Sequence, residues 1–258
     1  MVRAHCRISD GVIMNRKVVD THVHLLLSKK QRVPDWAAIK RMLDVAKVDE
    51  LDALCVTEHI EADGYQTLME GLFVENRLPG GDQHAGRLTY QGVAIFPGAE
   101  LELANRTNVG VHTDLEGLLA LDRAPGAYTL ERLHAVLEQR GRPFKLVAHH
   151  IFWPGKTCDD LQALGRYVNA IEVPAKDLAN AQNYVALAET LALDTTGGSD
   201  AHTFIQVGAC RTAFELPGSV RDCTAQDWIS SRQTSHLFTA QSPRLVVMSN
   251  IYRQSLMG

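Results

Sequence analysis

Short apolar runs that end in histidines or acids recur along this chain of 258 residues. Six of them are VVDTHVH, ALCVTEH, IFPGAELE, VGVH, LVAHH and TTGGSDAH. A run of about four to six apolar residues suits one buried strand, and the residue after its last buried position emerges at the sheet edge, where loops gather. Polar side chains from such strands would meet in space. The chain therefore predicts a metal site of imidazoles and carboxylates at one rim of a barrel.

The segments between these runs have helical periodicity, which indicates successive βα units around a parallel sheet. We expect seven strands, at residues 18–23, 53–57, 93–96, 108–111, 144–148, 169–173 and 194–196. Helices are expected at 34–51, 64–76, 129–141, 159–168, 178–191 and 225–232, and a loop at 78–89. A last strand at 237–240 would help to close the barrel. The predicted fold class is α/β, with the metal site at the C-terminal ends of the strands.

Length and composition favour one domain. Barrels of βα units reach this length as a single unit, and 45% hydrophobic with 22% charged residues matches a globular protein with a large core. We interpret residues 1–17 as a short N-terminal extension and 213–258 as a C-terminal segment that closes the barrel. The five cysteines are scattered and lack CxxC spacing, which indicates reduced, structural thiols.

Charge and hydropathy limit the expected partners. The formal net charge is -4 and no long run of lysine or arginine occurs, so we expect no duplex nucleic acid as a partner. The N-terminus lacks an apolar signal segment, and no stretch of about 18 apolar residues occurs, which predicts a cytoplasmic protein without a membrane partner. The sequence is compatible with an oligomer, but no feature of it indicates one.

His22 and His24 are separated by one residue, so on an extended strand both side chains leave on the same side. One ion can then take both imidazoles. Asp20 lies on that side too, and a metal-bound imidazole usually donates its other N–H to a carboxylate or a carbonyl. We therefore expect DxHxH to mark the metal site and Asp20 to orient a histidine there.

Carboxylates and another imidazole follow the next two strands. Glu58 and His59 end the strand at 53–57, and one of the two must face the rim whichever register applies. Glu100 follows a Pro-Gly turn that can aim its carboxylate across the barrel mouth, where each oxygen can serve one ion. Glu102 is the alternative for that bridging role.

The later strand ends add further candidates. His112 follows VGV, where it is either a ligand or an ordinary polar strand-end residue. His149 and His150 follow LVA, and we favour His149 as the inward residue because it comes first. Asp200 and His202 follow two glycines that let the backbone approach the site, and their DxH spacing supplies two ligands on one side.

The ordered set DxHxH, TEH, GAE, a lone His, AHH and GSDAH resembles the PHP family, named for its polymerase and histidinol phosphatase members. The resemblance spans residues 18–211 and implies a distorted, TIM-like barrel of seven strands, (βα)7, with up to three metal ions. Carried over by motif, it implies one ion on His22, His24, Glu100 and Asp200, a second on Glu100, His112 and His149, and a third on His59 and His202.

Two departures from the family pattern bear on the third ion. A further His or Asp commonly follows DxHxH by five or six residues in this family, and Lys29 and Lys30 occupy those positions here. The usual TDH is replaced by TEH, with the longer Glu58. We therefore expect two divalent ions (zinc, manganese or iron). At the third position, the ammonium of Lys29 or Lys30 could take the place of an ion.

The metal ligands and the resemblance predict a metal-dependent hydrolase. The favoured type is a phosphoesterase that acts on a small phosphorylated metabolite or nucleotide through a metal-activated water. His202 and His150 are candidate general acids if they are free of metal. Lys176, Arg211 and Arg106 are candidate phosphate-binding cations near the same rim.

Two other functions fit the same residues. An amidohydrolase-type barrel also places HxH after its first strand with later His and Asp ligands, and it would cleave C–N bonds. A noncatalytic PHP domain would use its metal for stability or to hold a partner, and the replacement of a ligand by Lys29 and Lys30 favours it.

Overall fold

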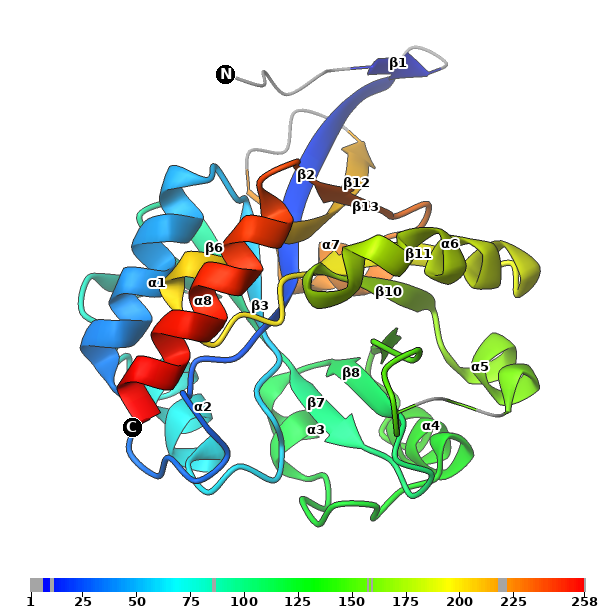
Figure 1. Ribbon diagram of the computed structural model, residues 1–258, viewed down its shortest axis with the longest axis horizontal. Coiled ribbons are helices and arrows are strands. Elements are labelled where there is room, and N and C mark those ends of the chain that lie inside the picture. Colours follow the sequence, from blue (N-terminus) through cyan, green and yellow to red (C-terminus); the bar gives the residue numbers. More distant parts are fainter. Residues whose placement is uncertain are drawn as a thin grey trace.

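A computed structural model of the chain describes residues 7–9, 12–84, 87–156, 158, 160–217 and 222–257. Their strands form two β-sheets with helices packed around them (Figure 1). Part of the predicted N-terminal extension, at residues 1–6, 10 and 11, lies outside this description. The rest of it belongs to the first two strands.

The larger sheet has eight strands within the described residues, in the order β13-β12-β2-β3-β6-β5-β4, and β1 pairs with β2 beside this path. Its strands are β1 (Arg7–Ser9), β2 (Val12–Val23), β3 (Ala53–Val56), β4 (Gly81–His84), β5 (Arg87–Tyr90), β6 (Val93–Pro97), β12 (Cys210–Pro217) and β13 (Ser235–Phe238). β2, β3 and β6 are parallel neighbours, and the other pairs are antiparallel.

The smaller sheet has the order β11-β10-β9-β8-β7. Its strands are β7 (Ala99–Glu102), β8 (Asn108–His112), β9 (Lys145–His149), β10 (Ala170–Pro174) and β11 (Asp194–Gly198). β9, β10 and β11 are parallel, whereas β8 is antiparallel to both of its neighbours. The direction of β8 decides which of its residues can reach the functional site.

The predicted seven-stranded TIM-like barrel is wrong, because the described strands form two sheets and no closed ring of parallel strands. The prediction treated each apolar run as a parallel strand, and an apolar run does not reveal its direction. Only Gly98 separates β6 from β7, and residues 103–107 separate β7 from β8. Parallel neighbours need a crossover of about a dozen residues or more, so these short connections bend or reverse the chain instead.

The helices flank the sheets. They are α1 (Trp36–Val48), α2 (Tyr65–Phe73), α3 (Leu115–Leu119), α4 (Leu130–Gln139), α5 (Leu161–Tyr167), α6 (Ala181–Thr190), α7 (Ala225–Ser230) and α8 (Ser242–Met257), with 3-10 turns η1 (Ala175–Asn180) and η2 (Phe204–Gln206). The predicted loop at 78–89 contains β4 and most of β5, and the predicted closing strand at 237–240 overlaps β13, which lies at an edge of the larger sheet. None of the described helices has the length and apolar character that a membrane crossing requires.

Helix α1 illustrates how local sequence sets these elements. The Asp35 side chain accepts from Ala38 N at 2.9 Å and so caps the first turn, where backbone N–H groups lack partners within the helix. Ile39, Leu43 and Ala46 lie at the spacing of one helix face and are fully buried. The face that the sequence predicted to be apolar therefore packs into the core.

Lys145 is a buried amine in this core. It begins β9, and its Nζ donates to the backbone O of Ser231 at 3.0 Å and to the Ser231 hydroxyl at 2.7 Å. The ammonium also lies 4.1 Å from the centre of the Trp228 ring. Burial penalises the charged form and lowers the pKa of Lys145 to about 7.

We predict that, because of Lys145, the unfolding free energy depends on pH in the alkaline range. The unfolded chain binds this proton up to about pH 10.4, whereas the folded chain releases it near pH 7, so the unfolding free energy rises with pH between these values. The Lys145→Met variant should lack this slope of up to about 1.4 kcal/mol per pH unit. Denaturant titrations at pH 7.5, 8.5 and 9.5 measure it. Lys47→Met, on the exposed side of α1, is the control, and parallel curves for wild type and Lys145→Met would refute the assignment.

Candidate metal centre

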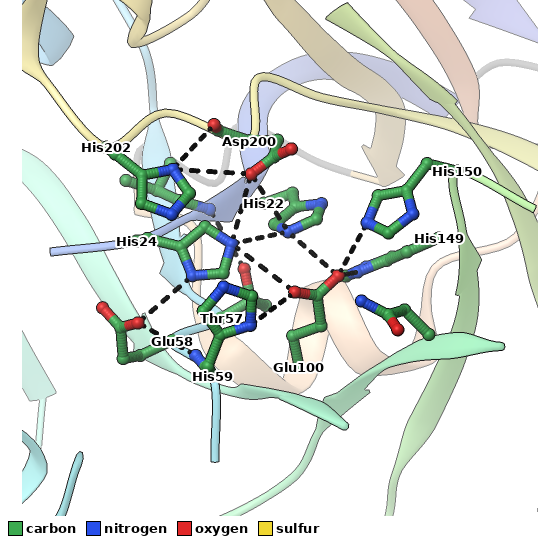
Figure 2. A network of polar contacts seen from close by, with 12 residues as sticks. His22, His24, Thr57, Glu58, His59, Glu100, His149, His150, Asp200 and His202 are labelled. Atoms are coloured by element: carbon green, nitrogen blue, oxygen red, sulfur yellow. Dashed lines mark hydrogen bonds and ion pairs between the residues drawn. The ribbon is translucent and has the colours of Figure 1, made fainter. Parts of the chain in front are cut away.

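The candidate metal centre lies where the two sheets meet. His59, after β3, forms an isolated parallel bridge with Glu100 of β7, and Glu100 N donates to Glu58 O at 2.9 Å. Figure 2 shows imidazoles and carboxylates from both sheets pointing toward one another around Glu100. The cluster of ionisable side chains therefore lies at the junction between the two sheets.

His22 and His24 leave the end of β2 on the same side, and their Nε2 atoms lie 3.0 Å apart. The other nitrogen of each ring faces a carboxylate: His22 Nδ1 is 2.7 Å from Glu172 Oε1, and His24 Nδ1 is 3.3 Å from Glu58 Oε1. An ionised carboxylate only accepts, so each Nδ1 is assigned as the donor. Each neutral ring then directs an Nε2 lone pair into the shared space.

Two lone pairs that face each other need a proton or a cation between them. Burial lowers the pKa of His22 to about 3. Burial has the same effect on His24, but hydrogen bonds to Asp200 and Glu58 outweigh it and raise the pKa of His24 to about 10. A proton on His24 can fill the gap. A divalent ion fills it equally well, because neutral imidazoles are metal ligands.

Glu100 contacts imidazoles from both sheets. Its Oε1 lies 3.0 Å from His149 Nδ1 and 2.9 Å from His150 Nε2, while its Oε2 lies 2.9 Å from His59 Nδ1. Burial raises the pKa of Glu100, but its electrostatic interaction with the His22 ring and the hydrogen bonds from its neighbours hold that pKa well below its usual value. The carboxylate is ionised and directs each oxygen to a different group of imidazoles, as a bridging ligand requires.

Asp200 closes the centre on the side of the loop after β11. Its Oδ1 lies 3.3 Å from His24 Nε2, and its Oδ2 accepts from Lys176 Nζ at 2.8 Å. The residue has a φ of 51°, a left-handed conformation that is costly outside glycine. Its N–H donates to His22 O at 2.8 Å, so the neighbouring strand stabilises this conformation.

Three overlapping groups of side chains could each hold an ion, because the ligand atoms of each group lie within 4.8 Å of one another. The groups are His22, Glu100, His149 and His150; His24, His59 and His202; and His22, His24 and Asp200. They contain every predicted ligand except His112, and they add His150, which the sequence suggested as a general acid.

His112 lies at the other end of its strand. In the antiparallel ladder of β8 and β9, Asn108 pairs with His149, whereas His112 pairs with Lys145. The His112 ring meets Trp228 edge-on with centroids 5.2 Å apart, and neither of its nitrogens has a hydrogen-bond partner among the described residues. The expectation of a ligand assumed a parallel strand, in which the last residue would reach the rim.

Asp20 accepts from the backbone, and the predicted contact with an imidazole ring is not formed within the described residues. Its carboxylate accepts from Ser199 N at 3.0 Å, Gly208 N at 2.8 Å and His22 N at 3.3 Å. Burial raises the pKa of Asp20 to about 6. Because Ser199 and Gly208 belong to the segment after β11, Asp20 ties this segment to β2.

The predicted phosphate-binding cations are separated in the fold. Lys176, in η1, reaches the centre through Asp200. Arg211 instead donates from Nη1 to Asp49 O at 3.1 Å, and Arg106 is exposed in the turn between β7 and β8. Of the three, Lys176 is the one that contacts a candidate ligand within the described residues.

Lys29 and Lys30 remain outside the three groups of candidate ligands. Lys29 forms an ion pair with Glu61, whose Oε2 is buried and has no hydrogen-bond partner among the described residues. Lys30 is exposed. A third ion stays a prediction that depends on His24, His59 and His202.

Sequence reasoning missed Glu172, which lies in the middle of β10. Besides its contact with His22, Glu172 accepts from His150 N at 3.2 Å, so one carboxylate positions two residues of the centre. A signal was present, because AIEVP contains one acid in an otherwise apolar strand. A buried carboxylate needs a partner, and that requirement points to a polar cluster nearby.

Two glycines in strands leave space for the side chains of the centre. A Cβ at Gly110 would lie 2.2 Å from His149 Nε2. A Cβ at Gly198 would lie 2.1 Å from Glu172 Oε1 and 2.4 Å from the Cβ of His22. All three distances are shorter than non-bonded atoms allow, so the cluster can form only against backbone without a Cβ.

Comparisons with known proteins bear on the family and on the fold. A family model described as PHP-associated matches residues 182–226, and no curated protein matches the chain. The solved structure of an Endonuclease Q complex with a 27-mer duplex that carries an abasic lesion at the active site has a TM-score of 0.56 and 14% identity, and the match covers 83% of this chain and 55% of that one. The lesion-specific endonuclease PfuEndoQ from Pyrococcus furiosus has a TM-score of 0.60 and 15% identity, with 86% and 57% covered.

These matches confirm the resemblance to the PHP family and show a shared fold with the two endonucleases. This chain spans a little over half of the length of either endonuclease. The expectation that excluded duplex nucleic acid is wrong, because a protein of this fold has been solved with a duplex at its active site. Net charge describes the whole chain, whereas contact with a substrate depends on the local surface.

We predict that Gly198→Ala will disrupt the centre. The added methyl must displace Glu172 or His22, so bound divalent metal should fall by at least about tenfold, with a stability loss of about 1–3 kcal/mol from overpacking. Metal analysis of protein purified without chelator, combined with thermal melting, measures both effects. Gly165→Ala in α5 is the control, since its Cβ would meet only the side chain of Leu191, at 3.3 Å. Unchanged metal content in Gly198→Ala would contradict the geometry.

We also predict that Glu172→Gln will weaken metal binding while the fold is kept. The amide oxygen can still accept from His22 Nδ1, but the negative charge that strengthens the imidazole as a ligand is lost. Metal affinity should fall by about 10- to 100-fold in a competition assay with a fluorescent chelator. Glu215→Gln, exposed on β12, should bind metal like the wild type. Equal affinities for Glu172→Gln and Glu215→Gln would show that Glu172 does not support a metal ligand.

Proposed function

We propose that this protein is a metal-dependent phosphoesterase that hydrolyses a phosphate ester with a metal-activated water. The observation that carries the proposal is the pair of facing nitrogens on His22 and His24, with both outer nitrogens on buried carboxylates. Imidazoles supported in this way are typical metal ligands. Further support comes from the PHP-associated match and from the fold shared with two endonucleases.

The side chains present fit divalent ions. The three candidate groups consist of imidazoles and carboxylates, the donor set that zinc, manganese and iron accept. Glu100 would bridge two ions, with His149 and His150 beside one oxygen and His59 beside the other. Bound ions would supply a water of lowered pKa and would offset the charge of the phosphate oxygens.

Other side chains of the chain would bind and protonate the substrate. The Lys176 ammonium lies beside Asp200 and 6.0 Å from the centre of the Trp153 ring, where it would hold a phosphate oxygen. His150 would protonate the leaving oxygen in any state in which it binds no ion, because its hydrogen bond to Glu100 outweighs burial and raises its pKa. His202 is the alternative acid, but burial lowers the pKa of His202 well below its usual value. The His150 ring is stacked on Trp153 with centroids 4.3 Å apart, which fixes its orientation.

We propose a small phosphorylated metabolite or nucleotide as the substrate. A second candidate is a phosphodiester bond in damaged DNA, which the similarity to the Endonuclease Q complex favours. An amidohydrolase reaction and a noncatalytic, metal-stabilised domain are the remaining alternatives. The buried carboxylates behind both histidines are as suited to C–N hydrolysis as to P–O hydrolysis, so the reaction is decided by assay.

The test is a substrate panel measured with manganese, zinc and iron. It contains phosphate monoesters, phosphate diesters, a duplex with an abasic site, and amide and lactam substrates. We expect phosphate release or strand cleavage that is lost in His22→Ala/His24→Ala by at least about 1000-fold, since two ligands of one ion are removed. Release of an amine instead, or no reaction with any metal, would overturn the proposal.

The same double variant separates catalysis from a structural role of the metal. If the ion serves hydrolysis, the melting temperature should stay within a few degrees of the wild-type value. If the ion holds the fold, the variant and the chelator-treated wild type should both unfold. Glu215→Gln serves as the matched control for activity and melting.

A further inference from the structure

A cleft of about 390 Å³ opens beside His202. It lies between α1, the segment after β2, η2 and α8, and Figure 1 shows α8 running beside α1. The apolar part of its lining consists mainly of Leu25, Met42, Phe204, Tyr252 and Leu256. Its volume falls in the usual range for a small-molecule site, roughly 300–1,000 Å³.

The cleft reaches the metal centre through one residue. His202 lines the cleft and also belongs to the candidate ligand group with His24 and His59. A phosphate held at the centre would therefore place an adjoining organic group within reach of the cleft.

The walls of the cleft are held by hydrogen bonds. Arg253 of α8 donates to Leu27 O from Nε at 3.0 Å and from Nη2 at 2.7 Å, which joins α8 to the segment after β2. Leu27 N in turn donates to Gln31 Oε1 at 2.7 Å. A site with bonded walls needs little rearrangement on binding, which lowers the entropic cost of association.

Two aromatic rings give the cleft its chemical preference. Phe204 of η2 and Tyr252 of α8 form an edge pair with centroids 5.4 Å apart and an angle of 68°. In such a pair one ring keeps a face available for a third ring. The lining also contains the polar side chains of Ser28, Gln31, Asp35, Arg41, His202 and Thr203, and the exposed Arg41 can donate to the edge of a bound ring.

We propose that this cleft binds the organic part of the substrate and selects phosphate esters that carry a planar aromatic group, such as a nucleobase. This rests on the proposed phosphoesterase function and adds specificity residues to it. One of the two rings, Phe204 or Tyr252, stacks on the bound ring and the other meets its edge, while Leu25, Met42 and Leu256 exclude water from its other side. These residues bind the group that is not transformed, so they act on specificity and not on the reacting phosphorus.

The test compares aromatic and aliphatic esters on the metal-loaded protein. The probes are phenyl phosphate, adenosine 5′-monophosphate and glycerol phosphate. Tyr252→Ala and Phe204→Ala should each lower kcat/KM for the two aromatic esters by about tenfold, mainly through KM, because stacking on an aromatic ring contributes at about this level. Glycerol phosphate should change by less than about twofold. Tyr252→Phe should keep the preference, since the ring face is retained.

Ile251→Ala is the matched control, because Ile251 precedes Tyr252 on α8, is 64% exposed and does not line the cleft. It should leave all three rates unchanged. An equal loss for aromatic and aliphatic esters in Tyr252→Ala, or no loss for any of them, would overturn the assignment of the cleft.

A binding measurement separates this proposal from the proposed function. Calorimetric titration with adenosine 5′-monophosphate in the presence of manganese should give at least about tenfold tighter binding to the wild type than to Tyr252→Ala. If the wild type hydrolyses no ester but this difference is found, the phosphoesterase function fails and the aromatic cleft stands. If esters are hydrolysed and the affinities are equal, the function stands and the cleft proposal fails.

Discussion

The buried carboxylate of Glu100 lies where β7 of the smaller sheet meets the segment after β3 of the larger sheet, and its charge determines what must surround it. An ionised carboxylate taken out of water costs several kcal/mol unless partners replace the lost hydration. Those partners are the ring nitrogens of His149 and His150 from one sheet and of His59 from the other. Solvating this one charge therefore requires both sheets to be in place, which makes the centre and the sheet junction mutually dependent.

Three further buried carboxylates hydrogen-bond to backbone N–H groups or to imidazole rings around the centre. Asp20 accepts from three N–H groups, and Glu58 accepts from Leu25 N, Leu26 N and the His24 ring. Glu172 accepts from His22 Nδ1 and His150 N. Each acid is thus fixed by main-chain donors or by a ring that it orients. These protein contacts orient the candidate ligands, which favours tight binding of an ion because little order must be gained.

The sequence predicted which side chains gather at the candidate centre better than it predicted the architecture that positions them. The alternation of His22 and His24 and the glycines before Asp200 depend on local backbone geometry, which short motifs encode directly. Strand direction depends instead on how distant segments pair, and the same apolar run suits either direction. That difference explains why His112 was expected at the rim although β8 places it beside Lys145. Glu172 was missed for the same reason, since it is distant from His22 in the chain and meets it only across the fold.

Glu58 also links the metal centre to the cleft beside it. One of its oxygens faces His24, and the other accepts from Leu25 N at 2.9 Å and Leu26 N at 2.8 Å, at the start of the segment that α8 holds through Arg253. The segment that lines the cleft is therefore anchored on a carboxylate that also orients a candidate ligand. A displacement of Glu58 would move both the His24 ring and the cleft wall, so the geometry of metal binding and the selection of the organic group are physically coupled. The longer side chain of TEH, relative to the usual TDH of the resembled family, provides the reach for this double contact.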